Sequence, residues 1–446
     1  MLLNRAVPAL ESTEAAPQRA GRRNPWLWVP TLYFAEGLPY SMVNVVSAAV
    51  FVTLGISNDR MAFFTSWLAL PWVIKPLWSP VVDILKTRRW WIWGAQYVIA
   101  AGLAGVAAVL PLPHFFAYSL CCLALVALGS ATHDIAADGF YMLALTEADQ
   151  SFFSGIRSTC YKCAWLFGQG SLVWLAGWLA NHVQSVSLAW TTVFAAVAIM
   201  FVGLGLYHRS ILPLPVADLA RPLPELKEFL VGFGATFAAF FRTPGLSRFL
   251  QFLLFYRFGE AQLVKMITPF LLNPRDAGGL GLKTEQFGWV YGTVGTVALM
   301  GGGIVAGWLV SRDGLRAWLW PLAIVMHVPD VVFVYLSYAQ PHDLRVIAAC
   351  VGAEQFGYGF GFTGYVLYMI YIARGEHRTA HYAICTGFMA LGLMLPGMWS
   401  GWLQKELGYP HFFTWVLVAT IPGFIVTAII PLDREFGKSG RNADNG

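Results

Sequence analysis

Two carboxylates stand one helical turn apart inside an apolar stretch of this sequence. Asp134 and Asp138 fall within residues 130–146, which read S-A-T-H-D-I-A-A-D-G-F-Y-M-L-A-L-T. At positions i and i+4, both side chains project from the same face of a helix. Ionisable side chains inside a membrane segment are costly, and they usually face an interior cavity or pair with other groups. The pair could therefore exchange protons or contact a polar substrate.

The surroundings of such a pair decide what it can do. A cavity of low dielectric and a like charge one turn away both favour the protonated form of a carboxyl group. Asp134 and Asp138 would then exchange protons as a coupled unit. The alternative interpretation is structural, in which one of them forms an ion pair with Arg157 or Lys162 of the next apolar segment.

The composition indicates a membrane protein. Of 446 residues, 57% are hydrophobic and only 12% are charged, against about 25% charged residues in soluble domains. Helices are expected because a chain in lipid must satisfy its backbone hydrogen bonds internally. The net charge of +5 does not indicate a nucleic-acid partner, since Lys and Arg gather at the ends of apolar segments. No metal site or cofactor is expected, because Cys160 and Cys163 lie in an apolar segment without a second pair.

The apolar segments predict an all-α membrane protein with twelve transmembrane helices in two six-helix pseudo-repeats. We expect a cytoplasmic N-terminal tail, a six-helix bundle, a cytoplasmic linker, a second six-helix bundle and a cytoplasmic C-terminal tail, at residues 1–25, 26–208, 209–245, 246–431 and 432–446. Most basic loop residues lie on the side of the two termini, which the positive-inside rule places in the cytoplasm. The polar first residues show no signal-peptide pattern.

The loops after the second and eighth segments echo each other. The first reads W-S-P-V-V-D-I-L-K-T-R-R-W-W-I-W and the second A-G-W-L-V-S-R-D-G-L-R-A-W-L-W. An acidic residue beside basic ones at this junction is similar to the signature loop of the major facilitator superfamily, whose two halves repeat in parallel. A gating charge cluster is predicted at Asp83, Lys86, Arg88, Arg89 and Arg312. The positive-inside rule alone would also explain the basic residues.

The sequence resembles the AmpG-type muropeptide permeases, in the peptide, acetyl-CoA and drug transporter branch of that superfamily. The matching stretches are F-A-E-G-L-P-Y at 34–40, K-P-L-W-S-P-V-V-D at 75–83, S-A-T-H-D-I-A-A-D at 130–138, L-L-F-Y-R-F-G-E-A at 253–261, G-G-G-I-V-A-G at 301–307 and E-Q-F-G-Y-G-F-G-F-T-G at 354–364. The resemblance implies a proton-driven importer of N-acetylglucosaminyl anhydro-N-acetylmuramyl peptides in the bacterial inner membrane. It also implies that Asp134 and Asp138 fall on the two acidic positions of the family's fourth-segment motif.

Charged residues concentrate on the first, fourth, seventh and tenth segments, which surround the central cavity of a two-half transporter. Proton coupling is predicted at Asp134, Asp138, Glu260 and Glu36. Substrate contacts are predicted at aromatic, amide and charged residues of the same segments, namely Tyr33, Tyr40, Asn44, Tyr141, Arg257, Gln262, Lys265, Glu354, Gln355 and Tyr358. Packing is the alternative role of each aromatic residue.

Two further expectations concern charges near these positions. Arg257 and Glu260 are spaced at i and i+3, so they could form an ion pair within one helix, either switchable or permanent. Lys75, Asp83 and Arg157 are expected near the ends of their segments, where water can reach them.

Two other classes of function compete with this interpretation. The same fold could carry a siderophore, an acyl-CoA-like anion or a drug. A membrane-embedded acyltransferase would use His133 and Asp138, which spell H-x-x-x-x-D, but residues five apart diverge on a helix. No nucleotide loop or nucleophile elbow accompanies them. We therefore expect a monomeric transporter in the lipid bilayer that binds a small molecule and protons, and not an enzyme.

Overall fold

The computed structural model describes residues 23–215, 218, 234–235, 237–373, 378–433 and 436–437. Most of the predicted tails and of the linker 209–245 therefore lie outside the described residues, as does the side chain of Asp83. In the part of the chain that is described, every regular element is helical. A helix of about 20 residues spans a bilayer core of about 30 Å, because each residue rises about 1.5 Å.

The first half of the chain forms six membrane-crossing rods. Their bounds, in chain order, are η1 Pro25–Leu27 with α1 Val29–Ser41, η2 Met42–Val46 and α2 Ser47–Thr53; α3 Asn58–Trp67 with α4 Leu70–Ile84; α5 Arg88–Val109; α6 Phe115–Ala144; α7 Glu147–Leu166 with η3 Phe167–Leu172 and α8 Val173–Val183; and α9 Val186–Ile211. The predicted segment around Asp134 is thus the uninterrupted helix α6.

The second half repeats this pattern with more interruptions. Its rods are α11 Leu246–Phe255 with α12 Phe258–Leu272; α13 Thr284–Phe287 with η6 Gly288–Gly295 and α14 Thr296–Asp313; α15 Leu315–His327 with η7 Val328–Asp330 and α16 Val331–Ala339; α17 Leu344–Ile372; and α18 Arg378–Ala419 with α19 Ile421–Ile429. A short turn, η5 Arg275–Ala277, follows α12. Two rods share α18, because Gly408 leaves the helical conformation there with φ 70° and ψ 164°.

Eight helices of the described chain are long and apolar enough to cross a membrane, and one of them, residues 380–429, holds the two rods that meet at Gly408. The other three rods are broken or carry charge. The rod of α3 and α4 is interrupted at Leu68 and Ala69, and the rod of α11 and α12 at Tyr256 and Arg257. The third, α17, holds Glu354. Interruptions at membrane depth are tolerated where the backbone faces other protein segments or a cavity.

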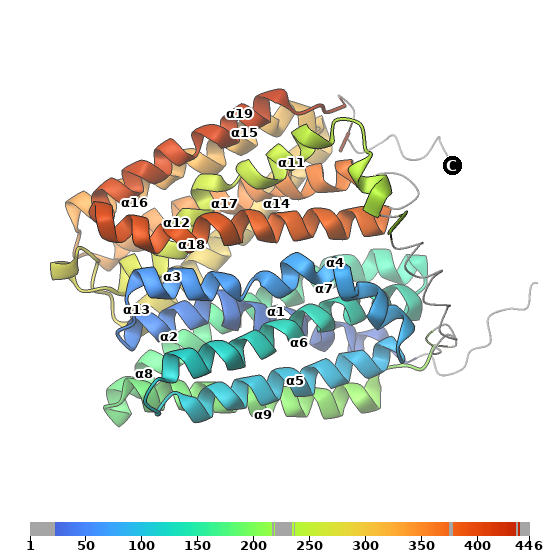
Figure 1. Cartoon of the computed structure of the whole chain (residues 1–446), viewed down its shortest axis with the longest axis horizontal. Coiled ribbons are helices and arrows are strands. Elements are labelled where there is room, and N and C mark those ends of the chain that lie inside the picture. The colour runs from blue at the N-terminus through green and yellow to red at the C-terminus, as the bar shows by residue number, and fades with distance from the viewer. Residues whose placement is uncertain are drawn as a thin grey trace, which may run out of the picture.

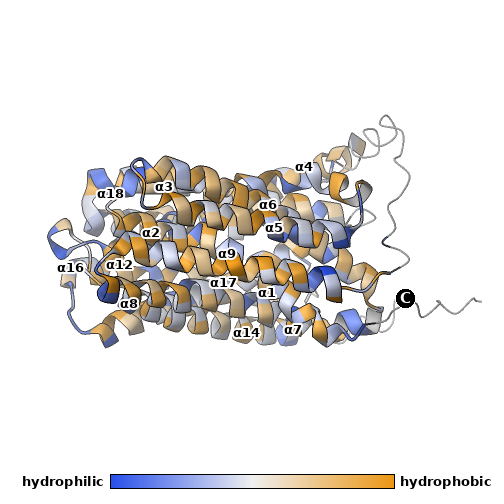
Figure 2. Cartoon of the chain, turned by 90° about the horizontal axis from the view of Figure 1, so that it is seen from below, coloured by the Kyte–Doolittle hydropathy of each residue, from blue (hydrophilic) through white to orange (hydrophobic). Residues whose placement is uncertain are grey.

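The rods form two neighbouring layers, with α1–α9 on one side and most of α11–α19 on the other, while α13 reaches across to α8 (Figure 1). Apolar residues run along the rods, and polar residues gather at their ends (Figure 2). Large apolar side chains such as Ile199 and Trp308 are exposed on the outside of the molecule. An exposed apolar surface of this kind fits contact with lipid.

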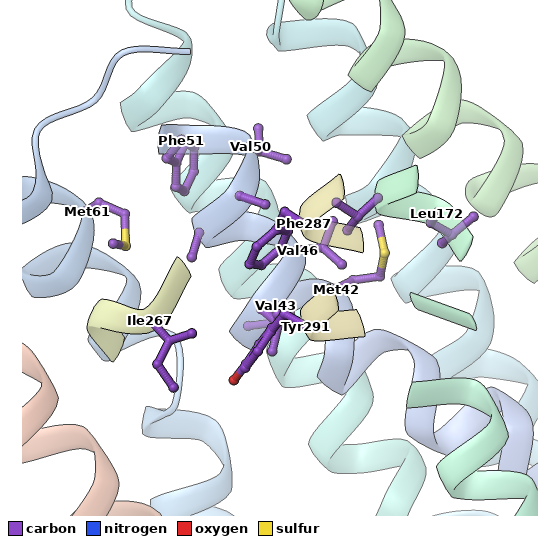
Figure 3. Packing of buried hydrophobic residues seen from close by; sticks show 14 of the residues in the cluster. Met42, Val43, Val46, Val50, Phe51, Met61, Leu172, Ile267, Phe287 and Tyr291 are labelled. Atoms are coloured by element: carbon purple, nitrogen blue, oxygen red, sulfur yellow. The ribbon is translucent and has the colours of Figure 1, made fainter. Parts of the chain in front are cut away.

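A hydrophobic cluster joins the two halves near one end of the rods. Met42 and Val43 of η2 share this cluster with Ile267, Phe287 and Tyr291 of the second half (Figure 3). Glycine permits the close approach of η3 and η6, since a Cβ atom at Gly292 would lie 2.1 Å from the Gln169 carbonyl oxygen. The halves are therefore tightly packed at this level.

Hydrogen bonds add a latch at the end of the rods that lies away from the termini. The latch comprises Asn58, Asn273, Gln404 and Tyr409. Asn58 Nδ2 donates to Gln404 Oε1 at 2.7 Å and to the Tyr409 hydroxyl at 2.9 Å. Asn273 Nδ2 donates to Asn58 Oδ1 at 3.1 Å and to the same hydroxyl at 2.9 Å. Close by, Lys405 pairs with Asp59 at 3.6 Å. The latch connects α3 with the second half.

A buried polar network ties four helices of the first half together. The Gln96 amide of α5 hydrogen-bonds with His133 Nε2 of α6 at 3.0 Å and with His208 Nδ1 of α9 at 2.7 Å. His208 Nε2 in turn lies 3.0 Å from Thr31 Oγ1 of α1. Gln96, His133 and His208 are fully buried. Hydrogen bonding offsets the cost of burying these groups.

Candidate functional site

The two aspartates of α6 each contact a different cation. Asp134 Oδ2 lies 3.6 Å from Lys75 Nζ of α4, and Asp138 Oδ1 lies 2.9 Å from Arg157 NH2 of α7. Trp72 Nε1 donates to Asp134 at 3.2 Å, and the Tyr33 hydroxyl donates to Asp138 at 3.2 Å. Of the two ion-pair partners considered from sequence, Arg157 is found. The Lys75 and Arg157 side chains, expected where water can reach them, are 22% and 33% exposed, and each also reaches an aspartate of α6.

Glu36 completes what we call the amino-terminal cluster: Glu36, Lys75, Asp134, Asp138 and Arg157. The Glu36 carboxylate is within electrostatic range of the other four groups. It is 8% exposed, and its Oε2 has no hydrogen-bond partner in the described structure. The cluster thus holds three carboxylates and two basic side chains, which leaves one negative charge when all groups are ionised.

Aromatic rings surround the amino-terminal cluster. The Arg157 guanidinium lies 4.6 Å from the ring centre of Tyr33 and 5.2 Å from that of Tyr141. Cation–π contacts of this kind hold an arginine in place while leaving its N–H groups usable. The Asp138 and Arg157 side chains are 41% and 33% exposed. Their exposure within the bundle makes them reachable by a polar ligand.

Tyr40 lies between the charged groups of the two halves. Its ring stacks on Trp165 at 5.6 Å and meets the edge of Trp72 at 4.9 Å. It is within electrostatic range of both Asp134 and Arg257. Asn44 Nδ2 donates to the Tyr40 backbone carbonyl at 3.0 Å.

Arg257 contacts aromatic side chains of α17. Its NH2 donates to the Tyr358 hydroxyl at 2.5 Å, and its guanidinium lies 4.8 Å from the Phe362 ring centre. Arg257 occupies the break before α12, with φ −109° and ψ 20°. Glu260 is in the first turn of α12, and neither of its carboxylate oxygens has a hydrogen-bond partner in the described chain. The expected ion pair between Arg257 and Glu260 is therefore not formed.

A second acidic group lies in the carboxy-terminal half. Glu260 of α12, Asp330 of η7 and Glu354 of α17 are all fully buried. One carboxylate oxygen from each lies within 4.8 Å of the other two. We call this group the carboxy-terminal triad. The predicted site contained Glu260 and Glu354 but lacked Asp330, and the only signal for Asp330 was a charge in an apolar segment.

Several predicted substrate residues contact other parts of the protein. Gln262 Oε1 accepts from Trp415 Nε1 at 3.0 Å, and its Nε2 donates to the Phe258 carbonyl at 3.2 Å. The side chain of Lys265 lies against Gly397 of α18. Gln355 Nε2 donates to Glu354 Oε2 at 3.0 Å, and the Tyr141 hydroxyl donates to the Gln150 carbonyl. Gln262 and Lys265 thus lie against α18.

His133 does not accompany Asp138. Its ring nitrogen bonds to Gln96 in the buried network, whereas Asp138 contacts Tyr33 and Arg157. The two residues considered for an acyltransferase therefore belong to different surroundings, as their helical spacing predicts.

The predicted gating charges are divided between the two halves. The backbone N–H groups of Arg88 and Arg89 donate to the two carboxylate oxygens of Asp218 at 2.8 and 3.1 Å. A carboxylate at this place stabilises the amino end of α5. Burial raises the pKa of the Asp218 carboxyl, while the N–H bonds and the arginine charges oppose that effect. Arg312 pairs with Asp313 at 2.9 Å, in the corresponding loop of the other half. Lys86 has a positive φ of 65°.

Comparison with known proteins identifies relatives along nearly the whole chain. A model described as the BT1 family matches residues 36–430. The anhydromuropeptide permease of Escherichia coli strain K12 is 23% identical over 420 residues, which cover 92% of this chain and 80% of the relative. Two solved structures share the fold at a TM-score of 0.68. A D-xylose-proton symporter is 12% identical and matches 91% of this chain and 97% of its own. A POT family transporter in complex with 5-aminolevulinic acid is 13% identical, with 92% and 98% covered.

Proposed function

This chain belongs to the BT1 family, and we propose that it imports cell-wall-derived anhydromuropeptides across the bacterial inner membrane together with protons. The major facilitator fold and the AmpG-type resemblance expected from the sequence are both confirmed. The chain is a multi-pass membrane protein of a transporter family. The identity of the substrate, the coupling to protons and the direction of transport are proposals. The monomeric state and the cytoplasmic placement of both termini are proposals as well.

The amino-terminal cluster is the observation that supports the proposal. It offers cations, carboxylates and aromatic faces on four helices, α1, α4, α6 and α7. Anhydromuropeptides present sugar hydroxyls, amides and carboxylates. Arg157 and Lys75 suit the carboxylates, because arginine and lysine form charge-assisted hydrogen bonds with them. Tyr33, Tyr40 and Tyr141 offer apolar faces with polar tips.

Competition for Arg157 would couple substrate to proton. When a substrate carboxylate binds Arg157, Asp138 loses the cation that stabilises its ionised form. The carboxylate of Asp138 then lacks a positive partner, and we propose that a proton supplies that charge. By linkage, proton binding at Asp138 also strengthens substrate binding by the same factor. Lys75 and Asp134 form a second pair at which the same exchange can occur.

The position of the latch supports the proposal of alternating access. The latch and the hydrophobic cluster hold the halves together at the end away from the termini. Transport requires that this end opens while the other closes, which the two halves of such folds achieve by rocking about a central site. We assign the predicted gating residues Asp83, Lys86, Arg88, Arg89 and Arg312 to the opposite end.

Uptake of labelled anhydromuropeptide into proteoliposomes under an inward proton gradient tests the proposal. We expect gradient-dependent uptake by the wild type, and its loss in Asp134→Asn and Asp138→Asn. Asp276→Asn is the matched control, because Asp276 is exposed in η5, far along the chain from the cluster.

Competition between ligands tests the identity of the substrate, and the aspartate variants test the coupling to protons. Unlabelled anhydromuropeptide should compete with the label, whereas a siderophore, an acyl-CoA or a drug should not. Normal gradient-driven uptake in both aspartate variants would contradict the coupling mechanism. Absence of any anhydromuropeptide uptake by the wild type would contradict the substrate.

A further inference from the structure

The carboxy-terminal triad is formed by residues far apart in sequence. Glu260 is in the first turn of α12, Asp330 ends the turn η7, and Glu354 lies in the middle of α17. Their nearest carboxylate oxygens all lie within 4.8 Å of one another. Two of the three rods that supply them are interrupted beside the triad. Interrupted helices at membrane depth are where ions bind in several transporter folds.

The triad has almost no partners among the described residues. Both oxygens of Glu260, both oxygens of Asp330 and Oε1 of Glu354 are buried without a hydrogen-bond partner in the described structure. Only Glu354 Oε2 is bonded, to the Gln355 amide. All three side chains are 0% exposed. Polar atoms that are this deeply buried are nearly always satisfied, so these oxygens point to a ligand that occupies the space between them.

The charges nearby do not balance the triad. Arg257 is within electrostatic range of Glu260, but its guanidinium bonds to Tyr358 and lies over aromatic rings. One arginine also cannot neutralise three carboxylates. Isolated ionised groups in a dry interior cost many kcal/mol, so they require a cation or protons.

We propose that Glu260, Asp330 and Glu354 bind a hard metal cation through their carboxylate oxygens. Ca²⁺ takes oxygen ligands at about 2.3–2.6 Å, which places ligands on opposite sides of the ion up to about 5 Å apart. The 4.8 Å limit of the triad fits such an ion. With Arg257 counted, a divalent cation leaves the group neutral, and Na⁺ does so when one carboxyl keeps a proton. Binding of this cation does not depend on the identity of the transported substrate.

Thermal unfolding of the purified full-length protein tests this site. The protein is treated with a chelator in choline chloride, and NaCl or CaCl₂ is then added at constant ionic strength. A ligand that binds only the folded state raises the melting temperature with concentration. We expect one of the two cations to do so, and the two arms distinguish Na⁺ from Ca²⁺. Equilibrium binding of the radioactive cation should give the same affinity.

Variants separate the site from general effects of charge. Asp330→Asn and Glu354→Gln should each raise the half-saturating cation concentration about tenfold or more, as the loss of a good ligand interaction does. Glu406→Gln, at an exposed position of α18, is the control and should behave as the wild type.

Two outcomes would overturn the proposal. Equal melting temperatures in choline, sodium and calcium would mean that protons neutralise the triad. A cation effect that persists unchanged in both triad variants would place the ion elsewhere. Folding of the variants is checked in choline chloride alone, where each should melt no lower than the wild type because it has lost an unpaired charge.

Discussion

The two halves of this protein bury their acidic groups in opposite ways. In the amino-terminal cluster, Asp134 and Asp138 each contact a cation, and the side chains are 15% and 41% exposed. In the carboxy-terminal triad, Glu260, Asp330 and Glu354 are fully buried and contact no cation through an ion pair in the described chain. A reachable group with exchangeable partners suits a site that binds and releases ligands in turn. A fully buried group without hydrogen-bond or ion-pair partners in the described chain suits a ligand that remains bound.

The comparison also predicts different changes in stability when a carboxylate is removed from each of the two groups. Removing a carboxylate from a pair leaves its cation alone, whereas removing one from an unpaired group relieves repulsion. Breaking a buried pair costs several kcal/mol, and exposure to water reduces that figure. Four changes would break or sharpen the distinction.

Loss of Arg157 should have the largest effect. Arg157→Gln removes the cation that holds Asp138 and the group proposed to bind a substrate carboxylate. We expect uptake in proteoliposomes to fall about tenfold or more, which corresponds to about 1.4 kcal/mol. Arg345→Gln, at an exposed position in the first turn of α17, is a suitable control. Wild-type uptake by Arg157→Gln would show that the pair only supports packing.

Carboxylate removal should change stability in opposite directions in the two groups. In cation-free buffer, Asp134→Asn should lower the free energy of unfolding by about 1 kcal/mol, because Lys75 loses its partner. Asp330→Asn should raise it or leave it unchanged, because the triad loses one of three like charges. Thermal unfolding of the two variants in the same buffer gives the comparison. Equal destabilisation by both would remove the distinction between the groups.

A double substitution should recover part of the loss in the amino-terminal cluster. Lys75→Met alone leaves Asp134 unpaired, whereas Lys75→Met combined with Asp134→Asn leaves no charge at that place. Groups in direct contact typically show coupling of about 0.5–3 kcal/mol. We expect the double variant to be more stable than the two single changes together predict, by about 0.5 kcal/mol. Strict additivity would mean that the 3.6 Å contact contributes nothing.

The latch should give the smallest effect. Asn58→Ala removes hydrogen bonds to Gln404, Tyr409 and Asn273, each worth about 1 kcal/mol or less where water can replace it. Cysteines in place of Asp59 and Lys405, in a background without other cysteines, report closure by cross-linking. The yield should fall a few-fold when Asn58 is replaced. An unchanged yield would assign closure to the hydrophobic cluster instead.

The sequence predicted the rods well, because apolar length is a local property. The apolar segment around Asp134, for example, corresponds to the uninterrupted helix α6. The pairing of Lys75 with Asp134 joins different helices, so spacing along one helix could not reveal it. Asp330 was missed for the same reason, since its neighbours come from α12 and α17. The break at Arg257 removed an ion pair that helical spacing had predicted.

The buried network of Thr31, Gln96, His133 and His208 limits how the first half can move. His133 and Asp134 are adjacent in α6, yet His133 bonds to α5 while Asp134 bonds to α4. Turning α6 alone to redirect Asp134 would break the bond to Gln96 and leave buried polar groups unsatisfied, at about 1–3 kcal/mol for each. Helices α1, α5, α6 and α9 should therefore travel as a single rigid body. Strain during a transport cycle would then fall on the interrupted rods, α3 with α4 in the first half and α11 with α12 in the second.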